Sequence, residues 1–232
     1  MTKGELLLII DTATTAGSVA LCCGERLLAE IVVDSLANHS DKLLLHIEQL
    51  LAEQQCELSG ITAFAVIDGP GSFTGLRVGV AAAKGLARAC HRPLLGVSSL
   101  HLLAAAMPYA THSVCSLIDA RKKEVYTATF STATGSPCLL DEPRVLPPQR
   151  LLDEMTAPAL FIGSGAVLYR ELIVARFGAL ATFAPWPLHT PRASSAAPLV
   201  LQQLRAGAKG DPELLLPRYI RPSEAEIAQQ KP

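Results

Sequence analysis

The chain has 232 residues, of which 50% are hydrophobic and 18% are charged, and its formal net charge is −1. This composition predicts a globular protein with a sizeable core, built as one large domain or two small ones. It excludes the strongly basic surface with which a protein binds nucleic acid on its own. The sequence holds no run of about 20 apolar residues that would span a membrane, and residues 6–10 are too short an apolar run for a signal peptide. We expect a cytoplasmic protein.

The first half of the chain alternates strand-like and helical patterns. Residues 6–22 read as two strands around a hydroxyl-rich turn, and a third strand follows a turn at Gly24. Apolar residues at helical spacing predict a helix over residues 40–53. The apolar run of residues 63–68 leads into GPGSFTGLRVG, residues 69–79. The helix predicted next, over residues 74–89, is apolar or small nearly all round, which is typical of a helix buried on more than one side.

The second half repeats features of the first. Residues 114–130, VCSLIDARKKEVYTATF, have the organisation of residues 6–22, and Asp119 matches Asp11. Residues 158–167 echo residues 63–72, because both are strands that enter a Gly-x-Gly turn. Chance similarity of short hairpins is the alternative, but two features in the same order favour a duplicated unit. Strands that alternate with helices in both halves indicate an α/β fold.

The remaining segments complete the predicted organisation. The proline-rich stretches 136–149 and 183–194 are predicted to be surface connections, and a helix is expected over residues 194–205. A short β-like segment lies between prolines in residues 215–222. We predict an N-terminal lobe of residues 1–105 and a C-terminal lobe of residues 106–207. A last segment, about residues 208–232, is expected to pack back on the first lobe.

The glycine-rich segment is a candidate anion site, because a helix that follows a glycine-rich turn offers free backbone N–H groups. It lacks the lysine of a P-loop, and its glycines do not have GxGxxG spacing. An aspartate at a strand end before a hydroxyl-rich turn is also how several phosphotransferases hold a magnesium-nucleotide. The candidate anion ligands are Asp11, Gly71, Ser72, Thr74 and Arg77. The alternative is that the glycines only permit a tight strand-to-helix turn.

The sequence contains no motif typical of a metal site, a nucleophilic serine or a cysteine pair. No two of the six histidines have the spacing of three or four that a helical metal pair needs. There is no GxSxG motif around a nucleophilic serine. The six cysteines form no CxxC pair, which favours buried reduced thiols. We therefore predict neither a catalytic constellation nor a metal site in this chain.

Four motifs together carry a family resemblance. They are IDTATTAGSVAL at residues 10–21, GPGSFTGLRVG at 69–79, DARKKEVY at 119–126 and PRYIRP at 217–222. In this order they resemble the TsaB (YeaZ) family, and they extend over nearly the whole chain. The resemblance implies the duplicated actin-like ATPase fold (ASKHA, ribonuclease H-like) of actin, sugar kinases and Hsp70. Such a fold has two lobes, each with a mixed β-sheet flanked by helices.

The resemblance also implies a function in tRNA modification. The family takes part in forming threonylcarbamoyladenosine next to the anticodon of tRNAs that read codons starting with A. Its paralogue TsaD carries the metal ion and transfers the threonylcarbamoyl group, and the ATPase TsaE completes the assembly. TsaD-like relatives have an HxxxH metal pair, whereas residues 96–106 here keep His101 but have Val97 and Ala105. The family thus implies a non-catalytic subunit without a cofactor, which contacts tRNA only indirectly.

Family members dimerise through helices of the N-terminal lobe, with TsaD or with a second copy of themselves. We therefore expect the helices of residues 40–53 and 74–89 to form the partner interface. The candidate interface residues are Leu45, Leu76, Val80, Ala83, Lys84 and Ala87. The alternative function is a small-molecule kinase of the same fold, in which Asp11 and the glycine-rich segment would hold ATP. The histidine spacing disfavours a metal-dependent peptidase.

Overall fold

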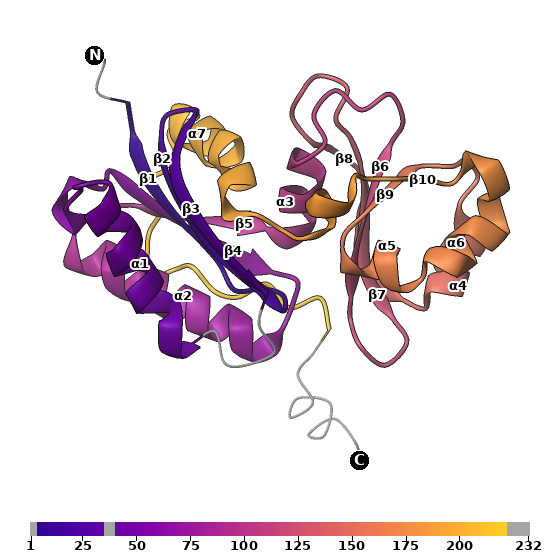
Figure 1. Ribbon diagram of the computed structural model, residues 1–232, viewed down its shortest axis with the longest axis horizontal. Coiled ribbons are helices and arrows are strands. Elements are labelled where there is room, and N and C mark those ends of the chain that lie inside the picture. Colours follow the sequence, from indigo (N-terminus) through magenta and orange to yellow (C-terminus); the bar gives the residue numbers. More distant parts are fainter. Residues whose placement is uncertain (1–3, 35–39, 222–232) are drawn as a thin grey trace. The chain divides into compact units, whose positions relative to one another are not determined.

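The computed structural model describes residues 4–34 and 40–221. Contacts between residues divide the described chain into two compact units. The first is made of residues 4–34, 40–102 and 191–217, and the second of residues 103–190 and 218–221. Each unit is a mixed five-stranded sheet flanked by helices (Figure 1). The predicted fold class, with two such lobes, is confirmed.

The sheet of the first unit has the strand order β3-β2-β1-β4-β5. Its strands are β1 (Leu6–Asp11), β2 (Ala16–Cys23), β3 (Arg26–Asp34), β4 (Ala63–Gly69) and β5 (Leu94–Ser98). The first three form an antiparallel meander, whereas β4 runs parallel to β1 and β5 runs parallel to β4. β1 is thus the central strand, and five of its six residues are buried.

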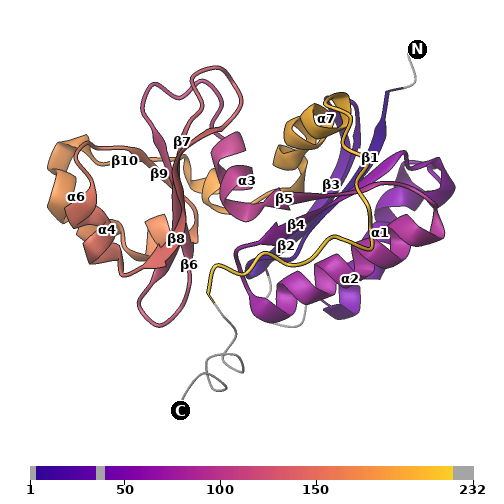
Figure 2. The same cartoon turned by 180° about the vertical axis from the view of Figure 1, so that it is seen from behind.

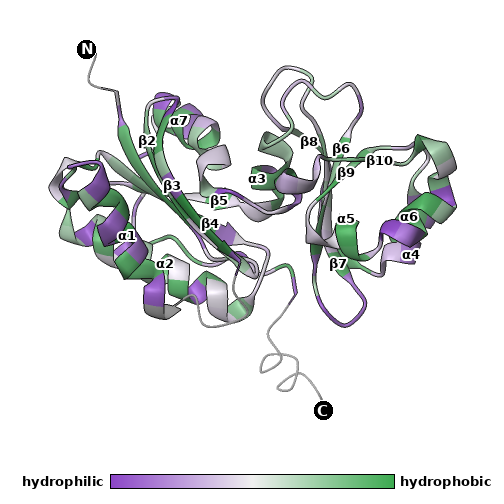
Figure 3. Ribbon diagram, in the orientation of Figure 1, coloured by the Kyte–Doolittle hydropathy of each residue, from purple (hydrophilic) through white to green (hydrophobic). Residues whose placement is uncertain are grey.

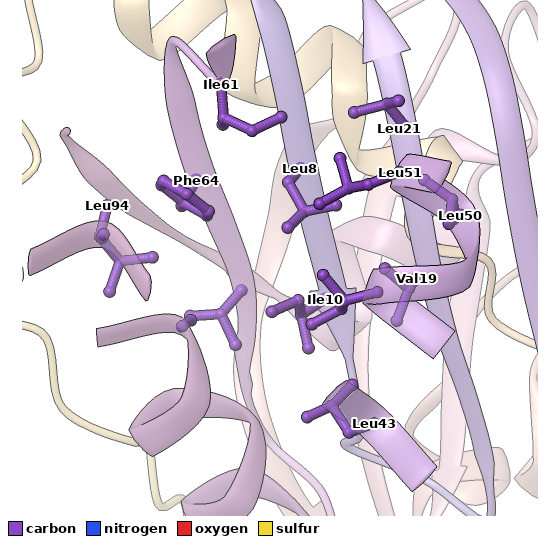
Figure 4. Close-up of a cluster of buried hydrophobic side chains, with 14 of the residues drawn as sticks. Leu8, Ile10, Val19, Leu21, Leu43, Leu50, Leu51, Ile61, Phe64 and Leu94 are labelled. Carbon is purple, nitrogen blue, oxygen red and sulfur yellow. The ribbon is translucent and has the colours of Figure 1, made fainter. Parts of the chain in front are cut away.

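Helices cover both faces of the first sheet. They are α1 (Ser40–Glu53), α2 (Phe73–Ala89) and α7 (Ala197–Arg205), while α3 (Ser99–Ala105) follows β5 directly. Figures 1 and 2 show α1 and α2 on one face of the sheet and α7 on the other. Leu8 and Ile10 of β1, with Phe64 of β4, face α1 and α2 and meet Leu50 of α1 in one buried cluster (Figure 4). The two helices predicted over residues 40–53 and 74–89 are confirmed to within one residue.

The second unit repeats the topology of the first. Its sheet has the order β10-β9-β6-β7-β8, with β6 antiparallel to β7 and parallel to β9. The strands are β6 (Val114–Asp119), β7 (Val125–Ser131), β8 (Cys138–Leu146), β9 (Leu160–Ile162) and β10 (Thr182–Phe183), and the helices are α4 (Pro148–Glu154), α5 (Ser164–Leu168) and α6 (Arg170–Phe177). β6 to β10 thus correspond in order to β1 to β5, which confirms the predicted duplication.

Both repeats end their first strand with the same turn. The Asp11 carboxylate accepts a hydrogen bond from the amide of Ala13 at 2.8 Å, and the Asp119 carboxylate accepts one from the amide of Arg121 at 2.9 Å. An aspartate that bonds the backbone two residues further on stabilises a tight turn. The matched aspartates therefore have a structural function in both units.

One predicted connection is a strand. Residues 136–149 contain β8, and α4 follows it from Pro148, so the prediction of a surface loop is wrong there. β8 lies at the edge of its sheet, where Pro143 removes no hydrogen bond that an inner strand would need. The β-like pattern predicted near the C-terminus is also wrong, because residues 215–221 form no strand. The last residue of that pattern, 222, and the rest of the predicted last segment, up to residue 232, lie outside the described residues.

The helix after residue 190 was predicted to belong to the C-terminal lobe, but it belongs to the first unit. The amide of Ala193 donates to the hydroxyl of Ser18 at 2.9 Å, and the amide of Ser194 donates to the carboxylate of Glu30 at 2.9 Å. Both acceptors lie on the sheet face opposite α1 and α2. This face of the sheet must be covered by apolar side chains, and the buried side of α7 provides them. The predicted lobe boundary is therefore wrong for residues 191–207, which belong to the first unit.

Hydropathy follows this layered arrangement. Figure 3 shows hydrophobic residues along the central strands of both units and mixed hydropathy on the helices. None of the helices in the described ranges is long and apolar enough to cross a membrane. The six cysteines are free thiols. The expectation that they are buried holds for Cys22 and Cys115, whereas Cys23, Cys56 and Cys90 are half-buried and Cys138 is exposed.

Candidate functional site

The glycine-rich segment joins β4 to α2 at one edge of the first sheet. β4 ends at Gly69, Ser72 caps the helix and α2 begins at Phe73. β1 and β4 are neighbouring parallel strands, so their carboxyl ends meet at this edge. The turn that follows Asp11 therefore lies against the glycine-rich segment.

Three glycines let this turn contact the start of α2 without a side chain between them. A methyl group on Gly71 would lie 2.1 Å from the carbonyl oxygen of Ala13, and one on Gly75 would lie 2.1 Å from that of Thr12. One on Gly79 would lie 2.2 Å from the hydroxyl oxygen of Thr12. Because no side chain fits at such distances, the glycines are required for the close approach of two backbone segments.

Hydrogen bonds close the same contact. The Ser72 amide donates to the carbonyl oxygen of Ala13 at 2.7 Å, and the Thr12 hydroxyl donates to the carbonyl oxygen of Gly75 at 2.7 Å. The Ser72 hydroxyl accepts from the amide of Gly75 at 3.3 Å. The amides of Ser72 and Gly75, two of the donors at this helix start, are thus bonded within the chain.

The predicted anion ligands differ in their surroundings. They are Asp11, Gly71, Ser72, Thr74 and Arg77. Gly71 and Ser72 contact the turn after β1, whereas Thr74 and Arg77 are exposed on α2 and the Arg77 guanidinium stacks 3.9 Å over the Phe73 ring. Asp11 is fully buried. The geometry supports the alternative that the segment is a tightly packed turn, and anion binding there stays a prediction.

Burial changes the chemistry of Asp11. One carboxylate oxygen accepts the bond from Ala13, while the other is buried without a hydrogen-bond partner among the described residues. The pKa of Asp11 is raised to about 7, mainly by burial and to a smaller extent by the nearby carboxylate of Glu30, while the hydrogen bond from the Ala13 amide opposes the rise. Near neutral pH this carboxyl is therefore protonated in a large share of molecules.

The predicted interface residues mostly face the chain's own core. Leu76, Val80, Ala83 and Ala87 are buried on the side of α2 that packs on the sheet, so their assignment to a partner interface is corrected. The Lys84 ammonium donates to the carbonyl oxygens of Glu213 and Leu215 at 3.2 and 3.1 Å, so it holds a later segment of the same chain. Of the six candidates, only Leu45 is a large apolar residue at the surface, with 58% of its side chain exposed.

Sequence reasoning missed the outward faces of the same two helices. Leu44 of α1 is 60% exposed beside Leu45. On α2 the exposed residues include Phe73, Ala81 and Gly85. A methyl group on Gly85 would meet nothing within 4 Å among the described residues, in contrast to Gly79. Residues 73, 77, 81 and 85 are spaced four apart and therefore lie on one face of α2. Because α2 is apolar or small nearly all round, its sequence does not show which of its faces is buried.

No group of three or more histidine, cysteine or acidic side chains is placed to hold a metal ion within the described part of the chain. His101 lies in α3, Val97 lies in β5 and Ala105 ends α3. The two positions four residues away from His101 thus offer no metal ligand.

The chain is similar in sequence to proteins of tRNA threonylcarbamoyladenosine biosynthesis. Residues 33–229 match the family model of TsaD, described as tRNA N6-adenosine threonylcarbamoyltransferase. The tRNA threonylcarbamoyladenosine biosynthesis protein TsaB of Bacillus subtilis is 31% identical over 228 residues, which cover 95% of this chain and 96% of that protein. The Escherichia coli protein of the same name is 38% identical over 126 residues, 53% of this chain and 54% of that protein.

Solved structures agree with the sequence comparison. The structure of YeaZ from Pseudomonas aeruginosa superposes with a TM-score of 0.79 at 32% sequence identity. The alignment covers 93% of this chain and 99% of the Pseudomonas chain. Both units of the fold are therefore included in the similarity.

The buried carboxyl predicts a pH dependence of stability. Because the folded-state pKa of Asp11, about 7, lies above its ordinary value of 3.8, the native state binds more protons between these values. The contribution of this carboxyl to stability is therefore fully present below about pH 4 and is lost as the pH rises through 7. Relative to Asp11→Asn, the wild type is expected to lose about 2–4 kcal/mol between pH 4 and pH 8. Urea unfolding at both pH values measures this, and parallel pH profiles of the two proteins would contradict it.

The surroundings of Gly75 and Gly85 predict that replacing each of them by alanine changes the free energy of unfolding in opposite directions. Gly75→Ala forces a methyl group against the carbonyl of Thr12 and should lower the free energy of unfolding by about 1–3 kcal/mol. Gly85→Ala, the matched control on the open face, should raise it by about 0.5–1 kcal/mol, because alanine favours the helix. Denaturant unfolding of both variants measures the difference, and equal effects would disprove the close-packing function of Gly75.

Proposed function

The chain belongs to the TsaB (YeaZ) family, and on that premise we propose that it is an accessory subunit in the biosynthesis of threonylcarbamoyladenosine in tRNA. It binds and supports TsaD, which transfers the threonylcarbamoyl group next to the anticodon of tRNAs that read codons starting with A, and it acts together with TsaE. The observation that carries this proposal is the similarity to the Bacillus TsaB protein over 95% of the chain. ATP and the metal ion belong to the partner subunits.

The geometry of the glycine-rich segment supports a non-catalytic subunit. In a kinase of this fold, the segment and the turn after β1 would hold phosphates. Here the backbone of Thr12 and Ala13 lies against Gly71 and Gly75, at distances that leave no room for a side chain. The carboxyl of Asp11 is fully buried, and one of its oxygens accepts the amide of Ala13 in the turn. These features favour the accessory subunit over the kinase.

The outward faces of α1 and α2 support a partner surface, here called the α1–α2 face. The two helices contact each other on the same face of the sheet (Figure 1). The face contains exposed apolar or small residues, namely Leu44, Leu45, Phe73, Ala81 and Gly85. Apolar side chains exposed on neighbouring helices are a feature of many protein–protein contacts, and small residues on a helix let a partner approach its backbone closely. We assign TsaD to this face, and a second copy of the chain when TsaD is missing.

Reconstitution of the modification tests the proposed function. Purified TsaD, TsaE, ATP, the other substrates and unmodified tRNA are combined with and without this protein, and threonylcarbamoyladenosine is quantified by mass spectrometry of digested tRNA. We expect modification only when the protein is present. A full rate without it would contradict the accessory function, and phosphorylation of a small molecule by this chain alone would favour the kinase.

A pair of double variants locates the partner surface by co-purification with TsaD. Leu44→Glu with Leu45→Glu places two charges on α1, and Val167→Glu with Leu168→Glu places two on equally exposed positions of α5. The first variant should weaken co-purification with TsaD by about tenfold or more, since buried apolar contacts dominate interface energy. The α5 variant should bind like the wild type. Equal binding by both, with unfolding midpoints unchanged, would remove the α1–α2 face from the interface.

A further inference from the structure

Residues 210–217, here called the strap, pass along the side of α2 that is turned away from α1. α1 contacts β2 and β3, whereas α2 contacts β4 and β5. The strap lies at the outer edge of β5, where the amide of Leu94 donates to the carbonyl oxygen of Gly210 at 2.8 Å. A methyl group on Gly96 of β5 would lie 3.2 Å from a methyl carbon of Leu215. α2 therefore has α1 on one side and the strap on the other (Figures 1 and 2).

Side chains of α2 hold the strap in place. The Lys84 ammonium donates to the carbonyl oxygens of Glu213 and Leu215 at 3.2 and 3.1 Å. One turn further along α2, the Arg88 guanidinium pairs with the carboxylate of Glu213 at 2.8 Å. Both members of this ion pair are exposed, so it contributes little on its own. Lys84, which is half-buried and bonds two backbone carbonyls, is therefore the main anchor of the strap.

The strap turns two leucines outward. Leu215 packs against the buried cluster of the first unit. Its neighbours Leu214 and Leu216 are 77% and 71% exposed, and they are the most exposed leucines among the described residues. Burial of one residue in a chain without helical structure leaves the residues before and after it on the outer side. The strap thus presents a pair of apolar side chains from a backbone that is fixed between them.

The outward leucines of the strap continue the α1–α2 face. Ala81 and Gly85 are exposed on α2, and Gly85 directly follows the lysine that anchors the strap. A protein that covers these two small residues has the exposed leucines of α1 on one side and those of the strap on the other. A single exposed leucine needs no explanation, but two in a fixed segment beside an apolar face enlarge that face.

We propose that TsaD contacts Leu214 and Leu216 together with the α1–α2 face, and that Lys84 is the positioning residue for this part of the interface. The inference rests on the proposed function, which assigns TsaD to the α1–α2 face. Lys84 was predicted as an interface residue, and in this proposal it acts through the strap without contacting TsaD itself. Because the strap is held in place before binding, less conformational entropy is lost when TsaD binds.

Two double variants of the full-length chain test the strap leucines. Leu214→Glu with Leu216→Glu adds two charges to the strap. Leu140→Glu with Leu180→Glu adds two charges at positions of the second unit that are 56% and 66% exposed, and it is the matched control. The affinity of each variant for purified TsaD is measured by isothermal titration calorimetry. We expect the strap variant to bind about tenfold or more weakly, while the control binds like the wild type and both keep the wild-type unfolding midpoint.

A second pair of variants tests the anchor. Lys84→Met removes the ammonium and keeps an unbranched side chain, whereas Lys84→Arg keeps a charged donor. Hydrogen exchange measured by mass spectrometry follows the amides of residues 213–216. We expect faster exchange there in the methionine variant and binding of TsaD that is about three- to tenfold weaker, because the strap must then be ordered on binding. The arginine variant should restore both. A merely structural function of Lys84 would change the exchange and leave the affinity for TsaD as it is.

Other outcomes overturn the proposal in distinguishable ways. An unchanged affinity of the strap variant removes TsaD from the strap, and weaker self-association with unchanged TsaD binding assigns the strap to a second copy of the chain. Weaker binding by Lys84→Met without faster exchange means that Lys84 contacts TsaD directly. If Leu44→Glu with Leu45→Glu weakens TsaD binding and the strap variant does not, the strap inference fails while the α1–α2 face stands. If the wild-type protein does not bind TsaD, the proposed function itself fails.

Discussion

The backbone contact between the turn after β1 and the start of α2 determines what the first unit can do. Gly71, Gly75 and Gly79 allow this contact, because the carbonyl and hydroxyl oxygens of Thr12 and the carbonyl of Ala13 lie where their side chains would be. The contact fixes α2 against the central strand and uses the Ser72 and Gly75 amides at its start internally. In our proposal, this packing replaces a phosphate site, and the outer face of α2 serves a partner.

The two repeats share a glycine contact and an aspartate turn, but the two turns differ in their surroundings. In the second unit a methyl group on Gly163 would lie 2.3 Å from the carbonyl oxygen of Leu117, so a glycine after β9 again permits close packing on the first strand. The aspartate turn also recurs. The difference lies in exposure, since Asp11 is buried in a neutral turn whereas Asp119 stabilises an open, basic one. Duplication thus produced two equivalent turns, of which the first packs against the glycine-rich segment and the second is exposed.

The sequence predicted most of the strands, the bounds of α1 and the duplication, because these depend on local periodicity. It did not predict that Val80 and Ala83 face the core, since α2 is small or apolar all round and only its contact with the sheet decides its orientation. β8 was missed because a proline is tolerated at a sheet edge. The position of α7 depends on hydrogen bonds to Ser18 and Glu30, which lie more than 150 residues away in sequence. The left-handed turn at Arg121 contains no glycine from which it could have been predicted.

The central claim is that this chain works by supporting TsaD and does not itself hold a nucleotide in the closed glycine-rich segment. Isothermal titration of Mg-ATP into the isolated protein, and into its complex with TsaD and TsaE, tests this claim most directly. The account predicts binding by the complex and none by the isolated chain. Stoichiometric binding by the isolated chain that is lost on Thr12 or Ser72 substitution would contradict it, because ATP would then occupy a site that the backbone is said to close.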